Sequence, residues 1–87
     1  SGHRHRMIDY SRLRSLTAHQ LISALIRDGF LFDRQRGSHH RYRHPDGRRV
    51  TVPFTRTGET FAPKTLRTII EDQSRWTEDD LKRLGLL

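Results

Sequence analysis

Two tight-turn signals divide the middle of the chain and limit the folds open to it. Gly37-Ser38 and the "PDG" at 45–47 are turn-forming stretches, and the segments around them, "FLFDRQR", "HHRYRH" and "RRVTVPF", have the lengths of β-strands. Connections this short join antiparallel neighbours, because parallel strands need a long crossover. We therefore predict a three-stranded antiparallel meander over residues 30–54.

Helical patterns flank this meander on both sides. "LTAHQLISALIRDG" repeats apolar residues at helical spacing behind a capping box of Thr17 and Gln20, and Gly29 is placed to end the helix. A second helix is expected from Pro63 through "KTLRTIIEDQ", and a short third helix in "WTEDDLKRLG", where Thr77 can cap. The order predicts an α+β fold, α–β–β–β–α, with the helices on one face of the sheet and an extra short C-terminal helix.

The apolar content leaves room for one domain. Of the 87 residues, 32% are hydrophobic, so two or three helices on a small sheet use all of them. We expect residues 16–87 to form this domain, and residues 1–15 to be an N-terminal extension that is partly disordered or tag-derived. The apolar stretches are too short for a transmembrane helix, and the absence of cysteine fits a reducing cytoplasm. We expect a cytoplasmic protein without membrane attachment.

The positive charge lies in the first half of the chain. The formal net charge is +7; residues 1–49 carry eleven arginines and four acidic residues, whereas residues 50–87 carry six basic and six acidic ones. Fifteen of the seventeen basic residues are arginine, whose planar fork fits phosphate oxygens. This distribution favours an acidic polymer as the partner, and nucleic acid is the commonest one.

Strand alternation separates the side chains of the histidine-rich segment "HHRYRH". Tyr42 is its one large apolar residue, so the side of the strand that carries Tyr42 should face the helices or the sheet rim. That side also carries His40 and His44. The open face is expected to carry His39, Arg41 and Arg43.

The residues of the open face suggest phosphodiester chemistry. Neighbouring cations disfavour the protonated form of an imidazole, so His39 would be available as a base at neutral pH. Arg41 and Arg43 can hold a phosphodiester and offset the charge that grows on it. An imidazole beside two guanidinium groups is suited to metal-independent RNA cleavage, in which the 2′-OH attacks the neighbouring phosphate. From these residues alone, however, we favour plain nucleic-acid binding, and RNA cleavage is the alternative.

Other chemistries fit the sequence less well. Three closely spaced histidines suggest zinc, but adjacent strand residues point oppositely and no carboxylate or cysteine completes a tetrahedral set. "GETFAPKT" lacks the glycine that a phosphate-binding loop has before Lys64, and Ser38 beside His39 cannot form a nucleophilic triad. For His40 and His44 we favour partly buried, structural positions. We expect no metal and no small-molecule cofactor.

The segments together resemble a known family. A helix ending in "DGF", then "RQRGSHHRYRHPDGRRVTVPF" and "PKTLRTII", is similar to the HicA family of bacterial toxins over residues 16 to about 74, most specifically in "GSHHRY". The resemblance implies a double-stranded-RNA-binding-like fold and metal-independent endoribonuclease activity on mRNA. It also implies neutralisation by a HicB-type antitoxin. The family's essential histidine corresponds to His39, which strand alternation also selects.

The chain departs from the family pattern at two places. Thr55 stands where many members have a histidine, which leaves the general acid unassigned. Lys64-Thr65 replaces Gly-Thr before the second helix and adds a cation where the helix would meet RNA. The missing histidine keeps two alternatives open: a non-catalytic RNA- or DNA-binding module, and an inactive relative kept as a partner-binding protein.

These observations predict a toxin that cleaves mRNA, with His39 as base or acid at the scissile phosphate. Gly37 and Ser38 shape the turn that presents it. The residues expected to contact RNA, with Arg41 and Arg43 as the main phosphate contacts, are Arg36, Ser38, Arg41, Arg43, Arg48, Arg49 and Lys64.

Overall fold

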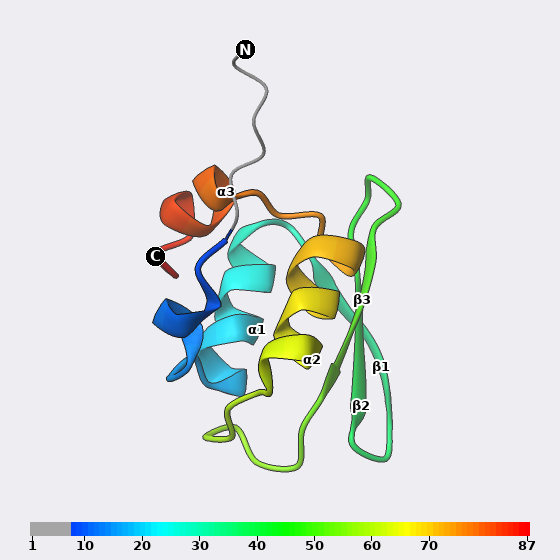
Figure 1. Cartoon of the computed structure of the whole chain (residues 1–87). Coiled ribbons are helices and arrows are strands. Elements are labelled where there is room, and N and C mark those ends of the chain that lie inside the picture. The colour runs from blue at the N-terminus through cyan, green and yellow to red at the C-terminus, as the bar shows by residue number, and fades with distance from the viewer. Residues whose placement is uncertain (1–7) are drawn as a thin grey trace.

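The computed structural model describes residues 8–87 and contains an antiparallel sheet with helices on one face (Figure 1). In chain order, its elements are η1 (Tyr10–Leu13, a 3-10 helix), α1 (Ala18–Arg27), β1 (Leu31–Arg36), β2 (His39–Arg43), β3 (Arg49–Pro53), α2 (Pro63–Arg67), η2 (Thr68–Gln73, a π-helix) and α3 (Glu78–Arg83). The strands form one sheet in the order β1-β2-β3. The predicted α+β fold with a three-stranded antiparallel meander is confirmed.

Local hydrogen bonds fix both ends of α1. Thr17 Oγ1 accepts from the Gln20 amide at 3.2 Å, and Gln20 Oε1 accepts from the Thr17 amide at 2.9 Å, which completes the predicted capping box. Gly29 follows the helix with a φ of +104°, and a Cβ at this position would lie 2.8 Å from Nε2 of His44. The chain therefore needs glycine where it leaves α1 and enters β1.

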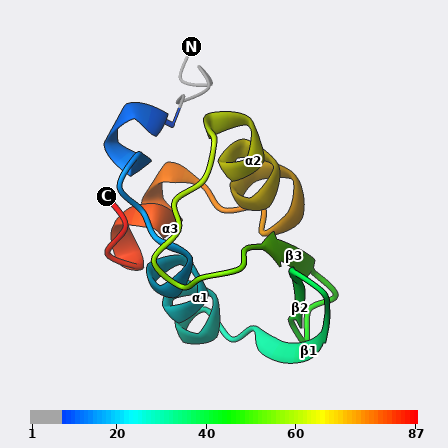
Figure 2. The same ribbon diagram turned by 90° about the horizontal axis from the view of Figure 1, so that it is seen from below.

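The second predicted helix consists of α2 and η2 in direct succession. The Ile69 carbonyl accepts bonds from the Ser74 amide at 2.9 Å and from Ser74 Oγ at 2.7 Å, so the last turn is wider than an α-helical turn. The residue before Ser74, Gln73, accepts a 2.6 Å bond from the Thr51 amide through its Oε1. This bond places the end of η2 beside the outer edge of β3 (Figures 1 and 2).

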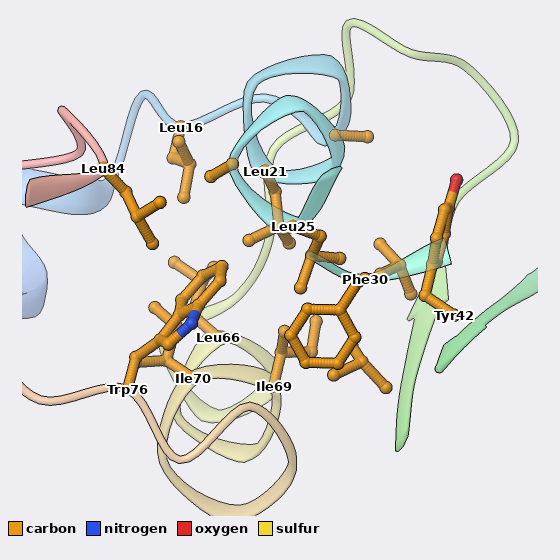
Figure 3. Packing of buried hydrophobic residues seen from close by; sticks show 14 of the residues in the cluster. Leu16, Leu21, Leu25, Phe30, Tyr42, Leu66, Ile69, Ile70, Trp76 and Leu84 are labelled. Atoms are coloured by element: carbon orange, nitrogen blue, oxygen red, sulfur yellow. The ribbon is translucent and has the colours of Figure 1, made fainter. Parts of the chain in front are cut away.

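The core lies between the helices and the inner face of the sheet (Figure 3). The antiparallel register pairs Tyr42 with Val50 and His40 with Val52, and the side chains of paired residues point to the same face. Tyr42, Val50 and Val52 are buried, so this is the face that the helices cover. The other buried residues labelled in Figure 3 are Leu16, Leu21, Leu25, Phe30, Leu66, Ile69, Ile70, Trp76 and Leu84.

Part of the expected N-terminal extension packs on the domain. Leu13 of η1 is 1% exposed and belongs to the core. The Tyr10 hydroxyl donates to Glu71 Oε2, and the Arg67 guanidinium lies 5.3 Å from the centre of the Tyr10 ring. Residues 1–7, including those that the sequence suggests are tag-derived, lie outside the described residues. Within residues 8–87 no helix is both long and apolar enough to cross a membrane.

Candidate nucleic-acid interface

The outer face of the sheet, which points away from the helices, is rich in arginine. The paired residues on this face are Leu31, Arg34, Arg36, His39, Arg41, Arg43, Arg49, Thr51 and Pro53. Five of them are arginines, all five are exposed, and none of these paired residues is acidic. Asp33, at the irregularity in β1, borders this face. The surface therefore carries a dense positive charge that suits a polyanion.

His39 begins β2 directly after a tightly held turn. Gly37 adopts a φ of +58°, and the Ser38 carbonyl accepts a 2.9 Å bond from the Phe54 amide. The His39 side chain is exposed and, among the described residues, makes no hydrogen bond or ion pair. The backbone around His39 is thus fixed while its imidazole stays available to a ligand.

An open groove of about 360 Å³ separates His39 from the second helix. It is lined by His39, Thr51, Pro53, Lys64, Thr65, Thr68, Ile69 and Gln73. Pro53 lies directly opposite His39 in the β2–β3 ladder, and Lys64 belongs to the first turn of α2. The groove therefore places an imidazole and an ammonium group around a partly apolar slot. Such an arrangement can hold an anion and exchange a proton with a hydroxyl beside it.

The other predicted contact residues lie around this groove or on the same face. Arg36 is opposite His39 in β1, and Arg49 is opposite Arg43 in β3. Arg36, Arg49 and Lys64 are exposed. Three further residues of the groove were not predicted from the sequence: Thr65, Thr68 and Gln73. The i, i+4 spacing of Lys64 and Thr68 was the available signal, but it does not show which side of the helix faces the sheet.

The histidines on the inner face are held by the fold. The His40 ring stacks on Phe54 with centroids 3.8 Å apart, and its Nδ1 lies 3.1 Å from the Ser38 carbonyl oxygen. His44 Nε2 lies 2.8 Å from the Asp28 carbonyl oxygen. Both histidines are partly buried, as expected. Among residues 8–87 no three His, Cys, Asp or Glu side chains are grouped in a way that could hold a metal ion.

Arg48 differs from the other predicted RNA contacts because its guanidinium is engaged within the protein. Its Nη1 lies 3.1 Å from Asp28 Oδ2 and donates to the Ser74 carbonyl at 2.7 Å. Its Nε donates to Asp46 Oδ2 at 2.7 Å, and the guanidinium carbon lies 4.9 Å from the centre of the Phe30 ring. With 19% of its side chain exposed, Arg48 ties the β2–β3 turn to other elements.

Thr55 follows β3 at the position where the family resemblance suggested a second histidine. Its hydroxyl donates to Glu59 Oε2 at 2.9 Å and its amide donates to Glu59 Oε1 at 3.2 Å. The hydroxyl bond first, and then the amide bond, hold the pKa of Glu59 below its ordinary value of 4.5. Thr55 and the Glu59 carboxylate thus brace the loop after β3.

The fold and this surface define a class of protein: small α+β domains with a cationic sheet face and an accessible histidine. Comparison with protein families narrows the class. Residues 18–74 match the model of the HicA toxin of bacterial toxin–antitoxin systems. The match covers well over half of the 87 residues, and the chain belongs to this toxin family. A comparison with curated proteins gave no match.

Proposed function

We propose that this chain is a toxin that cleaves mRNA as a metal-independent endoribonuclease, with His39 as its catalytic residue. The observation that carries the proposal is the placement of His39. Its exposed imidazole has no partner among residues 8–87, and it lies at a groove beside a face with five arginines. Family membership supports the toxin role.

The reaction assigned to this site is attack by the ribose 2′-oxygen on the adjacent phosphorus. The new bond joins the 2′-oxygen to phosphorus, the bond from phosphorus to the 5′-oxygen breaks, and a 2′,3′-cyclic phosphate and a 5′-hydroxyl are formed. The 2′-OH proton passes to His39, and the leaving oxygen takes a proton from the imidazolium or from water. Arg41, on the same face, and Arg36, opposite His39, are placed to offset charge on the phosphate.

The chemical nature of the new ends tests this reaction. Purified protein is incubated with a defined single-stranded RNA, and the fragments are analysed by mass spectrometry. The proposed route yields 2′,3′-cyclic phosphate and 5′-hydroxyl ends. Fragments that begin with a 5′-phosphate would contradict the route. Such ends form when water attacks the phosphorus and the bond from phosphorus to the 3′-oxygen breaks. Tight binding without any cleavage would favour the non-catalytic RNA- or DNA-binding alternative.

The RNA surface of this proposal extends along the outer face from the turn at Ser38. Its proposed cationic contacts are Arg36, Arg41, Arg43, Arg49 and Lys64. The arginines belong to three adjacent strands, and Lys64 lies across the groove on α2. A phosphate backbone that follows the face would therefore meet cations on either side of His39.

The antitoxin partner belongs to the same proposal. A free cationic ribonuclease surface would harm the cell that makes it, so we infer that a HicB-type antitoxin covers the groove at His39. The net charge of +7 favours an acidic partner. Competition binding with labelled RNA tests this idea: the antitoxin should displace RNA, and its association should slow as salt is raised. Simultaneous binding of both with unchanged affinities would contradict steric masking.

A further inference from the structure

We infer that the groove beside His39 is a subsite for one nucleobase of single-stranded RNA, in which Gln73 selects bases that present a carbonyl oxygen. This inference rests on the proposed ribonuclease function and adds the substrate contact that the catalytic residue alone does not supply. The side-chain amide of Gln73 and the apolar lining of the groove carry the argument.

The orientation of the Gln73 amide follows from its partner. The Thr51 amide can only donate, so the atom that lies 2.6 Å from it must be the Gln73 oxygen. The nitrogen, Nε2, is therefore directed away from Thr51, and it has no acceptor among residues 8–87. Gln73 is half-buried and lines the groove. Gln73 therefore brings two N–H donors, without a partner in the described part of the chain, to the lining of the groove, and its amide cannot turn over without losing the bond to Thr51.

The rest of the lining suits a flat ring. Pro53, half-buried on β3, supplies apolar surface to the groove, whereas Ile69 of η2 closes its floor and is only 1% exposed. The Thr68 hydroxyl already donates to the Lys64 carbonyl at 3.2 Å, so it can offer only its oxygen and its methyl group to a ligand. A volume of about 360 Å³ is at the lower end for ligand pockets and is sufficient for a single base. The positive charge of Lys64 and the sheet arginines favours a ligand attached to phosphates.

The shape of the groove selects the form of RNA. A base inside a duplex is stacked and paired, and its edges cannot reach a slot between a strand and a helix. Sequence-dependent recognition of RNA generally uses unstacked bases of single strands, which contact the protein through a face and an edge. The groove therefore favours single-stranded RNA, with one base splayed out beside the phosphate at which His39 transfers a proton.

The donor set selects the kind of base. Uracil, guanine and cytosine present carbonyl oxygens that accept from N–H groups, whereas adenine has none. The usual pairing of glutamine with adenine uses both the oxygen and the nitrogen of the amide, but the Gln73 oxygen is held by Thr51. We therefore expect uracil, guanine or cytosine to bind in preference to adenine. One hydrogen bond gained or lost corresponds to an affinity ratio of about fivefold.

The test measures binding rather than cleavage. In a His39→Ala background, which should keep RNA intact, fluorescence anisotropy gives the affinities for oligouridylate and oligoadenylate of equal length. The parent should prefer oligouridylate. Gln73→Glu is the decisive variant because it keeps an oxygen for the Thr51 amide and replaces the donor nitrogen with a second oxygen. The added negative charge should weaken both ligands, whereas the ratio of the two affinities should fall about fivefold or reverse.

Arg43→Ala is the matched control, because it removes an exposed cation of the outer face that does not line the groove. It should weaken both oligonucleotides equally and leave their ratio unchanged. Strong self-stacking of oligoadenylate affects parent and variants alike, so it cancels when the ratios are compared. Thermal unfolding of each variant identifies any loss of fold.

The outcomes separate this inference from the proposed function. An affinity ratio that is the same in the parent and in Gln73→Glu overturns the subsite, even if the protein cleaves RNA. A ratio that changes as expected supports the subsite, even if the wild-type chain proves not to cleave. If Gln73→Glu weakens antitoxin binding but leaves the ratio unchanged, the groove takes an antitoxin side chain, and the inference is wrong.

Discussion

Asp28 and Trp76 are joined across 48 positions of the chain by a hydrogen bond of 2.8 Å from the indole N–H to Oδ2. Arg83 donates to the other carboxylate oxygen at 2.9 Å, and Arg48 lies 3.1 Å from Oδ2. Only 10% of the Asp28 side chain is exposed. The carboxylate therefore links the end of α1 to the β2–β3 turn and to α3, which lies beyond the residues of the family match.

The ion pairs of Asp28 should make stability depend on this one carboxylate. Burial by itself would raise the pKa of Asp28, but the hydrogen bonds from Trp76 and Arg83 and the charge of Arg48 hold it below the ordinary value of 3.8. We expect Asp28→Asn to lower the free energy of unfolding by about 1.5–3 kcal/mol at neutral pH, as measured by urea denaturation. A change below about 0.5 kcal/mol, within the range of ordinary surface substitutions, would show that the cluster adds no net stability.

The pH dependence of the same variant gives a separate test. Because the pKa of Asp28 is depressed in the folded state, its contribution is present above the unfolded value near 3.8 and is lost as the pH falls through the lower folded value. The difference in unfolding free energy between wild type and Asp28→Asn should therefore shrink in acid. A difference that stays constant below about pH 4 would contradict the assigned pKa shift.

Glycine is required at position 29 for two reasons that can be separated. Gly29 and Gly47 have φ values of +104° and +101°, but an added Cβ meets His44 at 2.8 Å only at Gly29 and meets nothing at Gly47. Gly47→Ala should cost about 1–2 kcal/mol from backbone strain alone. Gly29→Ala should cost clearly more, because His44 must also move and weaken its bond to Asp28. Equal costs in thermal or urea unfolding would show that the contact is unimportant.

The arginines of β2 should set the salt dependence of RNA binding. If Arg41 and Arg43 each contact a phosphate, each change to Ala should weaken binding and flatten the log–log salt slope by about 0.7 for a single strand. Arg14 is a suitable control, since it is exposed and follows η1, which lies across the helices from the sheet (Figure 1). Arg14→Ala should leave the slope unchanged. An unchanged slope in both β2 variants would remove these arginines from the RNA surface.

Tyr42 tests the assignment of the two faces of β2. Its side chain is 7% exposed and meets the Phe32 ring edge-on at 5.7 Å between centroids. Tyr42→Ala should lower the free energy of unfolding by about 3 kcal/mol, whereas Tyr42→Phe should change it little because the ring is kept. Below the melting temperature, the Ala variant should still bind RNA. A variant of full stability that failed to bind would mean that Tyr42 contacts RNA directly.

The predictions that succeeded rest on local patterns. The Thr17–Gln20 capping box needs only side chains three residues apart, and alternation along β2 needs only one anchored residue, Tyr42. Both are therefore readable from the sequence. The exposure of His39 followed from the same alternation, although its chemical role stays a prediction.

The features that were not predicted depend on contacts between distant segments. The sequence predicted Arg48 as an RNA contact, and it gave no sign of Asp28 and Ser74, the partners of Arg48 that lie 20 and 26 positions away. The wide turn of η2 depends on Ser74 bonding to Ile69, and periodicity alone gives no sign of it. Gln73 reaches the groove through this turn. Its bond to Thr51 requires β3 and η2 to lie side by side, which no local sequence pattern shows.

Cleavage of single-stranded RNA by the wild type and by His39→Ala, with chelator in both reactions, tests the central proposal most directly. His19→Ala is the matched control. His19 is also an exposed histidine, but it lies on α1 and does not line the groove. We predict that the wild type and His19→Ala cleave in chelator, and that His39→Ala loses at least about hundredfold in rate while its melting temperature is unchanged. Undiminished cleavage by His39→Ala, or loss of wild-type cleavage in chelator, would contradict a metal-independent reaction centred on His39.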